Sequence, residues 1–557
     1  MIASSWFNQH SALLQDAIKA EKSRGFYTPF PENPKAYPAE SDEKGKLAFL
    51  SKMNTDFDEL LQTRPSRFEG EEISPWLGTG IGIKYPIFPD KLLVLQANQA
   101  GATWKNFSVN DRAGILLESL HRAQERFFEI AHATMHTTGQ SLMMAFQASG
   151  PHAADRALEV LAVGYEQLNR YPESVSWEKP QSKTTLTVSK KFKAIPRGVG
   201  LVIGCSTFPT WNSLPGIFAN LLCGNPVLVK PHPKAVLPIA IYVSILQKTL
   251  QEAGANPLTV QLACDTQTFP ITRDLVEHPD VRLVDYTGNS GFGNWIEAQS
   301  ILSNQVVFTE KTGVNSVLIH STNDYAGMIQ NLAFAVTLYS GQMCTSPQNF
   351  FIPQQGIETL EGMKSMQQFG DDLHATISGL LSHPKIGSSA SCALGNDQLL
   401  RKRAEAQIQP GVTRWPEIPA AQNEEFPEAV LTSPTLLGTN TQHLPLISKE
   451  WFGPIVFLVE TNGFDSALKT AAGLAKQHGM ISCGCYSTDE SVMQTVAETM
   501  ETAGVQVCFN YHGGVYVNQN AAFSDFHLTG GNPAGNGVFT NSEFVSRRFF
   551  WVGHRFG

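Results

Sequence analysis

The sequence predicts an α/β protein with two lobes, each built on a mainly parallel sheet that helices cover on both faces. Short apolar runs that end in turns alternate with helix-length segments, first between residues 198 and 288 and again between residues 315 and 487. Strands that alternate with helices in this way are typical of βαβ units, whose ligands bind beyond the carboxyl ends of the strands. The 557 residues, 42% of them apolar, suffice for two such cores.

The chain begins with a polar, proline-rich stretch that reaches about residue 85. Here we expect a short first helix, an irregular segment and a second helix around 47–61, together an extension wrapped on a larger body. Apolar residues then recur at helical spacing over 111–144 and 153–170, which predicts a helical layer before the first strong strand.

The strands of both lobes can be placed from their apolar runs. In the first lobe we expect strands at 198–204, 225–230, 258–263 and 281–288, with a helix from Leu237 to Ala253 that Gly254 closes. In the second lobe we expect strands near 315–320, 350–353, 454–460 and 481–487, and helices at 324–339, 358–381 and 464–478. A Gly/Asn-rich loop over 529–537 precedes the last strand-like segment.

The composition excludes several classes of function. Lys and Arg number 41 against 50 Asp and Glu, a formal net charge of −9, which is opposite to the basic field that nucleic acids or anionic membranes require. The longest apolar stretch, 235–246, contains Pro238 and is too short to cross a bilayer, and the N-terminus fits neither a signal nor a transit peptide. Eight scattered cysteines suit a reducing compartment. We therefore expect a cytoplasmic protein that acts on a small molecule and binds neither nucleic acid nor membrane.

Cys344 is the strongest candidate for catalysis. An apolar helix stops at Ser340 and Gly341, and Cys344 follows where the chain must turn. A thiol presented at the boundary between two lobes has the access to substrate that covalent catalysis needs. The pattern alone leaves the alternative of a buried, inert cysteine.

Glu310 is the second candidate, at the end of an apolar run and ahead of a glycine-containing turn. A carboxylate against an apolar wall can act as a general base on water. An ordinary surface glutamate paired with Lys311 is the alternative.

Two strand-to-turn segments, 224–234 and 286–293, could contact a phosphate. The first carries cations, and the second carries glycines and hydroxyls ahead of a helix whose N-terminus favours anions. The spacing of Gly288, Gly291 and Gly293 is not that of a Rossmann fingerprint, so a simple tight turn is the alternative.

Other signals favour structure over chemistry. His132 and His136 have the helical spacing of a zinc pair, but Ala133 stands where the catalytic glutamate of that motif belongs, and we expect no metal site. Cys483 and Cys485 flank Gly484 in a strand-like run, so both should face the core.

The candidate cysteine, the candidate glutamate and the two strand-to-turn segments occur in the order and at the spacing of a known family. Over about residues 90–550 the chain resembles the aldehyde dehydrogenase superfamily. The resemblance rests on the run 341–344 (GQMC), on Glu310, Lys230 and Gly288, and on 449–454 (KEWFGP). Segments 24–34, 135–156 and 204–238 more narrowly resemble the family of the phenylacetic acid degradation protein PaaN.

The resemblance implies a division of the chain. It implies an N-terminal extension over 1–85, an NAD(P)-binding domain over 86–308 with about 509–535, and a catalytic domain over 309–508. It also implies oligomerisation strands at 175–195 and 540–557, with Ser182–Phe192 and Phe544–Val552 as the candidates, in a homodimer or homotetramer. A solvent-exposed hairpin explains these two segments nearly as well.

The resemblance also implies NAD(P)-dependent oxidation of an aldehyde to a carboxylate. Cys344 would attack the carbonyl, backbone N–H groups and a side chain would hold the oxyanion, and hydride would leave to the nicotinamide. Glu310 would activate the water that hydrolyses the thioester. The substrate would be a semialdehyde from ring cleavage in phenylacetate breakdown, either free or linked to CoA.

Cofactor contacts follow from the same resemblance. Glu450 would hold the nicotinamide ribose, and Phe452 would pack near the ring. Lys230 would bind the adenosine ribose, and Gly288 with Asn289 would border the pyrophosphate.

The chain departs from the family pattern at the oxyanion motif and at the general base. The usual Pro-Trp-Asn-Phe-Pro reads 205–209 (CSTFP), so Thr207 takes the place of the amide donor, with Asn212 as a less favoured substitute. The usual Glu-Leu-Gly-Gly reads 310–313 (EKTG), which loses one glycine and leaves Glu310 less mobile or poised differently by Lys311.

A third departure concerns the choice of cofactor. Pro233 stands where many NAD-preferring members carry a glutamate that bonds the ribose 2′-hydroxyl. His232 and Lys234 could attract a 2′-phosphate, so we expect NADP to be accepted alongside NAD.

Two other functions stay open at this point. A CoA-acylating dehydrogenase would release its thioester to CoA, although it would not need Glu310. A catalytically weak member with a nucleotide-binding or assembly role would fit the changes at Thr207 and around Glu310.

Overall fold

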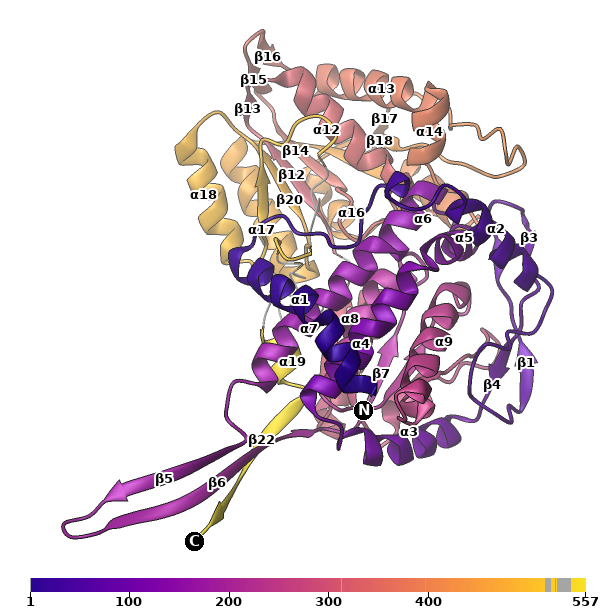
Figure 1. The fold of residues 1–557 in the computed structure, drawn as a ribbon. Coiled ribbons are helices and arrows are strands. Elements are labelled where there is room, and N and C mark those ends of the chain that lie inside the picture. The colour runs from indigo at the N-terminus through magenta and orange to yellow at the C-terminus, as the bar shows by residue number, and fades with distance from the viewer. Residues whose placement is uncertain (1, 312, 396, 516–521, 526, 528–541) are drawn as a thin grey trace.

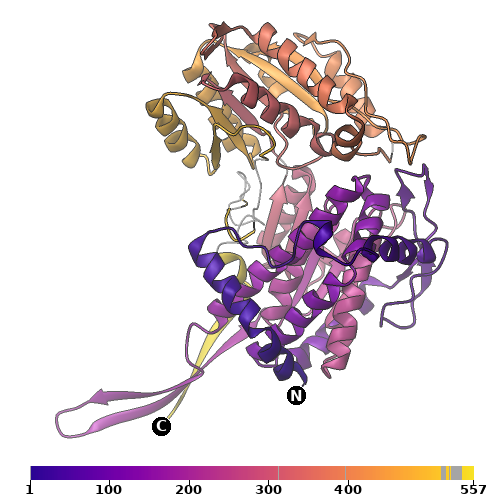
Figure 2. The same cartoon turned by 45° about the horizontal axis from the view of Figure 1, so that its top comes forward.

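A computed structural model describes residues 2–311, 313–395, 397–515, 522–525, 527 and 542–557. These residues form two α/β lobes, an N-terminal extension and a three-stranded sheet that projects from the first lobe (Figure 1). In Figure 2 the indigo N-terminal helices run across the first lobe, and the orange second lobe lies above it. The predicted two-lobed α/β class is confirmed. Among the described residues, no helix is long and apolar enough to cross a membrane.

The first lobe contains a five-stranded parallel sheet in the order β11-β10-β7-β8-β9. Successive residues of a strand face opposite cores: Val202 and Val229 pack into one hydrophobic cluster, and Leu201 and Leu228 into another. The chain order reverses between β7 and β10, which is where such sheets bind ligands. The strands are β7 Val199–Ile203, β8 Val227–Lys230, β9 Val260–Leu262, β10 Val281–Gly288 and β11 Val306–Lys311.

Helices precede this sheet, as predicted, and cover both of its faces. The helix expected from Leu237 ends at Glu252, two residues before Gly254, whose φ of 77° suits glycine. The helices are α3 Asp90–Trp104, α4 Val109–Gln124, α5 Phe127–Thr138, α6 Leu142–Ser149, α7 Pro151–Leu168, α8 Pro209–Leu222, α9 Leu237–Glu252, α10 Thr272–Glu277 and α11 Ser290–Ser303.

The second lobe contains a seven-stranded sheet in the order β17-β18-β19-β14-β12-β20-β21, in which β17 alone runs antiparallel to its neighbour. Cys483 and Cys485 are both buried in its core, as expected. The strands are β12 Ser316–Ile319, β14 Asn349–Pro353, β17 Thr413–Arg414, β18 Thr435–Asn440, β19 Ile455–Thr461, β20 Cys483–Tyr486 and β21 Val507–Phe509. The helices are α12 Tyr325–Thr337, α13 Met366–Ser382, α14 Pro384–Ala390, α15 Gln398–Gln407, α16 Leu444–Ser448, α17 Phe464–His478 and α18 Glu490–Glu501.

Two of the expected helices are partly wrong. The second helix of the extension is α2, Ser41–Lys52, because Asn54 adopts a φ of 60° and the chain beyond it pairs with Ile81 and Lys84. The helix expected over 358–381 begins only at Met366. Before it, β15 Ile357–Thr359 and β16 Gly362–Lys364 form a hairpin, and a Ser365 capping box then starts α13.

The extension also contains α1 Ile2–Ser23, the short helix η1 Pro34–Ala36 and four short strands. Those strands are β1 Arg67–Glu69, β2 Ile73–Ser74, β3 Thr79–Gly80 and β4 Tyr85–Ile87. Its apolar side chains belong to the same hydrophobic cluster as α4, α7 and α9, so the extension is part of the first lobe's core.

The projecting sheet joins segments that lie far apart in the chain. Strands β5 Ser174–Pro180, β6 Thr185–Pro196 and β22 Phe549–Phe556 pair antiparallel in the order β22-β6-β5 (Figure 1). Phe544 lies in the short helix α19, Ser542–Ser546, and not in the strand expected from 544 to 552. Arg548, ahead of β22, anchors the sheet by a buried ion pair with Asp285 on β10. The expected loop at 529–537 lies outside the described residues.

Candidate active site

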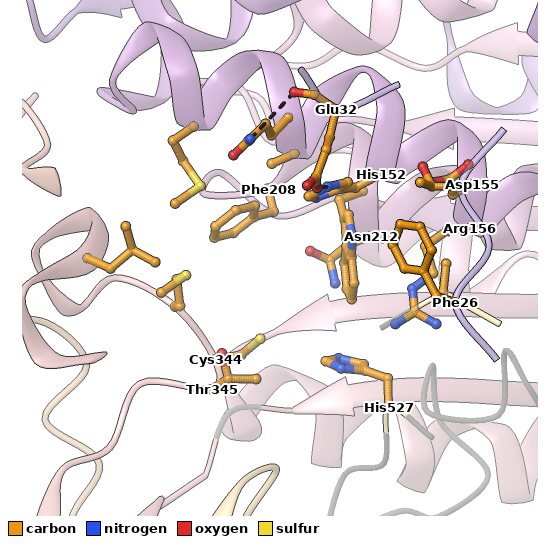
Figure 3. A pocket seen from close by; sticks show the side chains of 18 of the residues that line it. Phe26, Glu32, His152, Asp155, Arg156, Phe208, Asn212, Cys344, Thr345 and His527 are labelled. Carbon is orange, nitrogen blue, oxygen red and sulfur yellow. Dashed lines mark hydrogen bonds and ion pairs between the residues drawn. The ribbon is translucent and has the colours of Figure 1, made fainter. Parts of the chain in front are cut away.

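Two cavities meet at Cys344. The first, of about 270 Å³, is lined by the extension, α6, α7, the start of α8 and the segment around Cys344 (Figure 3). The second, of about 620 Å³, is lined by the turns that follow β7, β8 and β10 and by residues of the second lobe. Phe208, Asn212 and Cys344 line both cavities. The thiol is therefore accessible from two sides, which we call the α7 cavity and the strand-end cavity.

The backbone ahead of Cys344 is shaped to end α12 and present the thiol. Tyr339 and Ser340 both adopt left-handed conformations, with φ of 52° and 50°, an arrangement that costs energy in residues other than glycine. Gly341 has a φ of 66°, and a Cβ there would lie 2.6 Å from the carbonyl oxygen of Gly453. The glycine of the GQMC run is thus required by space and by conformation.

Asn315 fixes the loop that carries the nucleophile. Its Nδ2 donates to the carbonyl oxygen of Cys344 at 2.6 Å and to that of Ser346 at 3.0 Å. Its Oδ1 accepts from the backbone N–H groups of Ile481 and Ser482 ahead of β20. The side chain therefore ties the loop to the sheet of the second lobe, a role that the sequence did not reveal.

Cys344 itself is partly buried. Desolvation raises the pKa of its thiol well above the usual range, and the nearby charge of Glu310 raises it further. The thiol is protonated at neutral pH in this state, so a base must take its proton when it attacks.

Glu310 lies at the end of β11, 2% exposed, between two partners from other elements. Asn212 Nδ2 donates to Oε2 of Glu310 at 3.1 Å, and His527 Nε2 lies 2.7 Å from Oε1. One ligand-type atom from each of Glu310, Cys344 and His527 lies within 4.8 Å of the others. A thiol, a carboxylate and an imidazole this close form a unit that can transfer protons.

His527 is the main residue that sequence reasoning missed. It stands about 180 residues after Cys344 in a region without strong periodicity, and no motif flags it. Its ring contacts the Trp211 ring edge-on at 4.9 Å, and it lines the α7 cavity, whereas Glu310 lines the strand-end cavity. The pair therefore connects the two cavities.

Most of the predicted site residues come together around the strand-end cavity. It is lined by Thr207, His232, Lys234, Gly288, Asn289, Glu310, Cys344, Glu450 and Phe452. Asn289 caps α11 by accepting from the N–H of Phe292 at 3.0 Å, so a helix N-terminus borders the cavity. Helix N-termini stabilise phosphate, and the volume is that of a site for a sizeable ligand.

Two of the expected cofactor contacts differ in the structure. Lys230 is 3% exposed, its Nζ lies 2.6 Å from Oδ1 of Asp265, and it is not among the residues that line the cavity. Burial, together with the charges of Lys230 and Lys234, lowers the pKa of His232 to about 4. His232 is neutral at pH 7, so of this pair only Lys234 supplies a positive charge, and Lys402 also lines the cavity.

The two candidate oxyanion side chains are placed differently. Thr207 Oγ1 lies 3.8 Å from the sulfur of Cys205, and Thr207 lines only the strand-end cavity. Asn212 lines both cavities beside Cys344. The geometry thus favours the residue that the sequence motif ranked second. Thr312, in the altered loop after Glu310, lies outside the described residues.

The extension, for which the sequence indicated no role, contributes to both cavities. Phe26, Tyr27, Thr28 and Glu32 line the α7 cavity. Glu71, Ile73 and Pro75 line the strand-end cavity, where Glu71 Oε1 accepts from the N–H of Gln267 at 3.0 Å. No sequence signal could have placed them there, because the extension shows no regular pattern.

The helical histidines have structural partners. His132 Nε2 lies 2.8 Å from Oδ1 of Asp42, and the His136 ring stacks on Phe49 while its Nδ1 lies 2.8 Å from the hydroxyl of Ser74. Both side chains thus bind the extension to α5.

Comparisons with known proteins agree with this geometry. The sequence model of the aldehyde dehydrogenase family matches residues 91–537. A crystal structure of an NAD-dependent aldehyde dehydrogenase from Burkholderia multivorans is 39% identical, and the match covers 99% of this chain and 98% of that one with a TM-score of 0.93. A Thermus 1-pyrroline-5-carboxylate dehydrogenase with bound NAD shares the fold at 16% identity, with a TM-score of 0.72 over 95% of this chain and 99% of that one.

Curated relatives are more distant. A Staphylococcus saprophyticus protein named as an aldehyde dehydrogenase is 22% identical over 56% of this chain and 62% of its own length. Human 4-trimethylaminobutyraldehyde dehydrogenase is 25% identical over 69% of this chain and 74% of its own length.

Proposed function

Because this chain belongs to the aldehyde dehydrogenase family of NAD(P)-dependent oxidoreductases, we propose that it oxidises an aldehyde to a carboxylate through a thioester on Cys344. One observation carries the proposal: the Cys344 thiol is shared by two cavities, and Glu310 and His527 lie within reach of it. The α7 cavity takes the aldehyde, and the strand-end cavity takes the cofactor.

The residues of the strand-end cavity fit a dinucleotide. Glu450 and Phe452 line this cavity and would hold the nicotinamide end near Cys344, and Gly288 with Asn289 would border the pyrophosphate at the start of α11. Lys234 and Glu71 lie at the same cavity and set the charge that an adenosine ribose meets. NAD or NADP bound here supplies a hydride acceptor.

Acylation begins with proton transfer from Cys344 to Glu310. The thiolate adds to the aldehyde carbon, and the new C–S bond leaves a tetrahedral oxyanion. We assign the side-chain donor for this oxyanion to Asn212, with Thr207 as the weaker candidate, because Asn212 lies at the meeting point of both cavities. Loss of hydride from the former aldehyde carbon then yields the thioester.

Hydrolysis needs Glu310 a second time. Glu310 must first lose the thiol proton, and His527, hydrogen-bonded to Oε1, is placed to pass it to the α7 cavity. The carboxylate then takes a proton from water as the hydroxide attacks the thioester, and Cys344 leaves as the thiolate.

For the substrate, the resemblance to the phenylacetate protein family favours a semialdehyde from ring cleavage, free or CoA-linked. A cofactor-dependent screen of such semialdehydes against wild type and Cys344→Ala tests the activity. We expect NAD(P)H formation by wild type and none by the variant, and full activity of Cys344→Ala would overturn the mechanism.

Product analysis separates hydrolysis from transfer to CoA. We expect a free acid formed at the same rate with and without CoA. A thioester product that forms only with CoA would identify the acylating alternative.

We further propose that the sheet of β5, β6 and β22 joins subunits into a homodimer or homotetramer. It projects from the lobe and carries exposed Val175, Trp177 and Leu186 among charged neighbours, as an intersubunit edge requires. Sedimentation of a variant lacking 174–196 tests this: dissociation to monomers is expected.

A further inference from the structure

The extension supplies the outer wall of the α7 cavity, although it lies before residue 91, where the family match begins. The segment Phe26–Glu32 connects α1 to the short helix η1 and lies directly beside the N-terminal half of α7, with Glu32 next to His152 (Figure 3). Phe26 is 70% exposed, an unusual position for a large apolar side chain beside a cavity that reaches a reactive thiol.

This wall is held to α7 and α6 by specific contacts. Thr28 Oγ1 lies 2.7 Å from Oδ2 of Asp155, and Glu32 Oε2 lies 2.9 Å from Nε2 of His152. The amide of Gln147 donates to the carbonyl oxygen of Glu32 at 3.5 Å. The segment is therefore a fixed part of the cavity.

One side of the cavity near Cys344 is apolar, opposite the polar Asn212 and His527. Phe208, Phe334, Leu338 and Met343 pack together in one hydrophobic cluster and line this part of the cavity. An aldehyde whose carbonyl reaches Cys344 must therefore place an apolar stem against these side chains.

Farther out, the wall offers hydrogen bonds without an excess of positive charge. Arg156 pairs with Glu159 at 2.9 Å and lies over the Trp211 ring, and Arg24 lies 3.9 Å from the same glutamate. Asp525 lies in the field of both arginines. Among the described residues, two cations thus face two carboxylates, so their formal charges balance.

The acidic residues of the wall also disfavour an anionic ligand. Asp155 is 3% exposed and its Oδ1 has no hydrogen-bond partner among the described residues, and burial raises the pKa of this carboxyl well above its usual range. The His152 hydrogen bond lowers the pKa of Glu32, so Glu32 is charged at pH 7 and opposes a second carboxylate at the mouth.

We propose that Phe26–Glu32 together with Asp155 forms a selectivity wall. The wall favours aldehydes that have an apolar stem and an uncharged, hydrogen-bonding far end. It disfavours aldehydes of equal length that end in a carboxylate. The proposal rests on the proposed aldehyde oxidation. Within the proposed substrate class, it favours the thioester-linked form over the free acid.

A matched pair of substrates tests this selectivity. We expect wild type to oxidise methyl 6-oxohexanoate with a kcat/KM at least tenfold above that for 6-oxohexanoate, and above that for hexanal. Equal values for the ester and the acid, or a preference for the acid, would overturn the proposal, and the latter would assign carboxylate binding to Arg156. Propanal, too short to reach the wall, reports the basal reaction: no oxidation of any aldehyde would instead defeat the proposed function.

Variants then locate the effect. Glu32→Gln should raise kcat/KM for 6-oxohexanoate several-fold. Asp155→Ala should remove the advantage in kcat/KM of the ester over hexanal. Phe26→Ala should raise KM for all three long aldehydes. Propanal kinetics, measured in each variant, provide the basal rate to which the values for the long aldehydes are normalised. Phe68→Ala, an exposed phenylalanine of the same extension that lines neither cavity, serves as the matched control. Because Phe26 is exposed, its variant is expected to fold, and an unchanged profile for Phe26→Ala and Glu32→Gln would refute the assignment to this segment.

Discussion

His527 Nε2 lies 2.7 Å from Oε1 of Glu310, and the two side chains are only 1% and 2% exposed. The contact joins residues 217 positions apart and links the strand-end cavity, which Glu310 lines, to the α7 cavity, which His527 lines. It gives the proposed general base a partner on the side of the α7 cavity, which we propose takes the aldehyde.

Removal of the imidazole should slow hydrolysis more than acylation. In His527→Gln an amide can still donate to Glu310 but cannot carry a proton, so we expect a burst of about one NAD(P)H per subunit followed by a steady state at least tenfold slower. Stopped-flow absorbance measures both phases. His478→Gln, at the exposed end of α17, is the control. A variant that slows the burst and the steady state by the same factor would show that His527 acts only on structure.

The oxyanion assignment separates two neighbouring side chains. Asn212→Ala should lower kcat about 10²-fold, the usual cost of one lost oxyanion donor. Thr207→Val, which removes a hydroxyl that lies near Cys205, should lower kcat less than about threefold. Steady-state kinetics on both variants decide the matter, and the reverse order of effects would restore Thr207 to the role that the sequence motif gives it.

The reactivity of Cys344 should depend steeply on pH. Its thiol pKa is raised, so the thiolate fraction lies far below one at pH 7 and increases about tenfold per pH unit. We expect the rate of alkylation by iodoacetamide, followed by peptide mass spectrometry, to rise from pH 7 to pH 9 without levelling. Glu310→Gln removes a nearby negative charge, lowers this pKa, and should accelerate alkylation several-fold at pH 7.5. A plateau below pH 8 in the wild type would contradict the expected raised pKa.

Cofactor choice should respond to Glu71 and Lys234. Both line the strand-end cavity: Lys234 lies in the turn after β8, and Glu71 accepts from Gln267 in the turn after β9. By the family resemblance, Pro233 stands where many NAD-preferring members carry a glutamate. Glu71→Gln removes a charge that repels a 2′-phosphate and should raise the ratio of kcat/KM for NADP over NAD several-fold. Lys234→Gln should lower the same ratio. If neither variant changes the ratio, the adenosine ribose does not reach these residues.

Sequence patterns predicted the sheets better than the extension. The eight strands we placed lie within two residues of the observed ones, because each is an apolar run bounded by turn residues. The helix expected over 358–381 was wrong in its first turns, where Gly362 with a φ of 106° permits a hairpin that helical periodicity does not reveal. In the extension, long-range pairing of Phe57 with Lys84 decides where the helix ends.

The residues of the site likewise differ in how far the sequence predicts them. Cys344, Glu310, Glu450 and Phe452 stand in motifs, so the family resemblance located them before any geometry was known. His527, Glu71 and the segment around Glu32 reach the cavities only through tertiary packing. Lys230 also stands in a motif, but its side chain pairs with Asp265, so its contact with the cofactor stays a prediction.

The central claim is that oxidation passes through a thioester on Cys344 that Glu310 helps to hydrolyse. Intact-protein and peptide mass spectrometry of Glu310→Gln, mixed with an aldehyde and NAD(P), tests it most directly. Because this variant also lacks the base that takes the thiol proton, its acylation should be slow, and after prolonged incubation the account predicts one equivalent of NAD(P)H per subunit and a stable acyl group on Cys344, with neither product in Cys344→Ala. NAD(P)H formation without an acyl group on Cys344, or sustained turnover by Cys344→Ala, would contradict it.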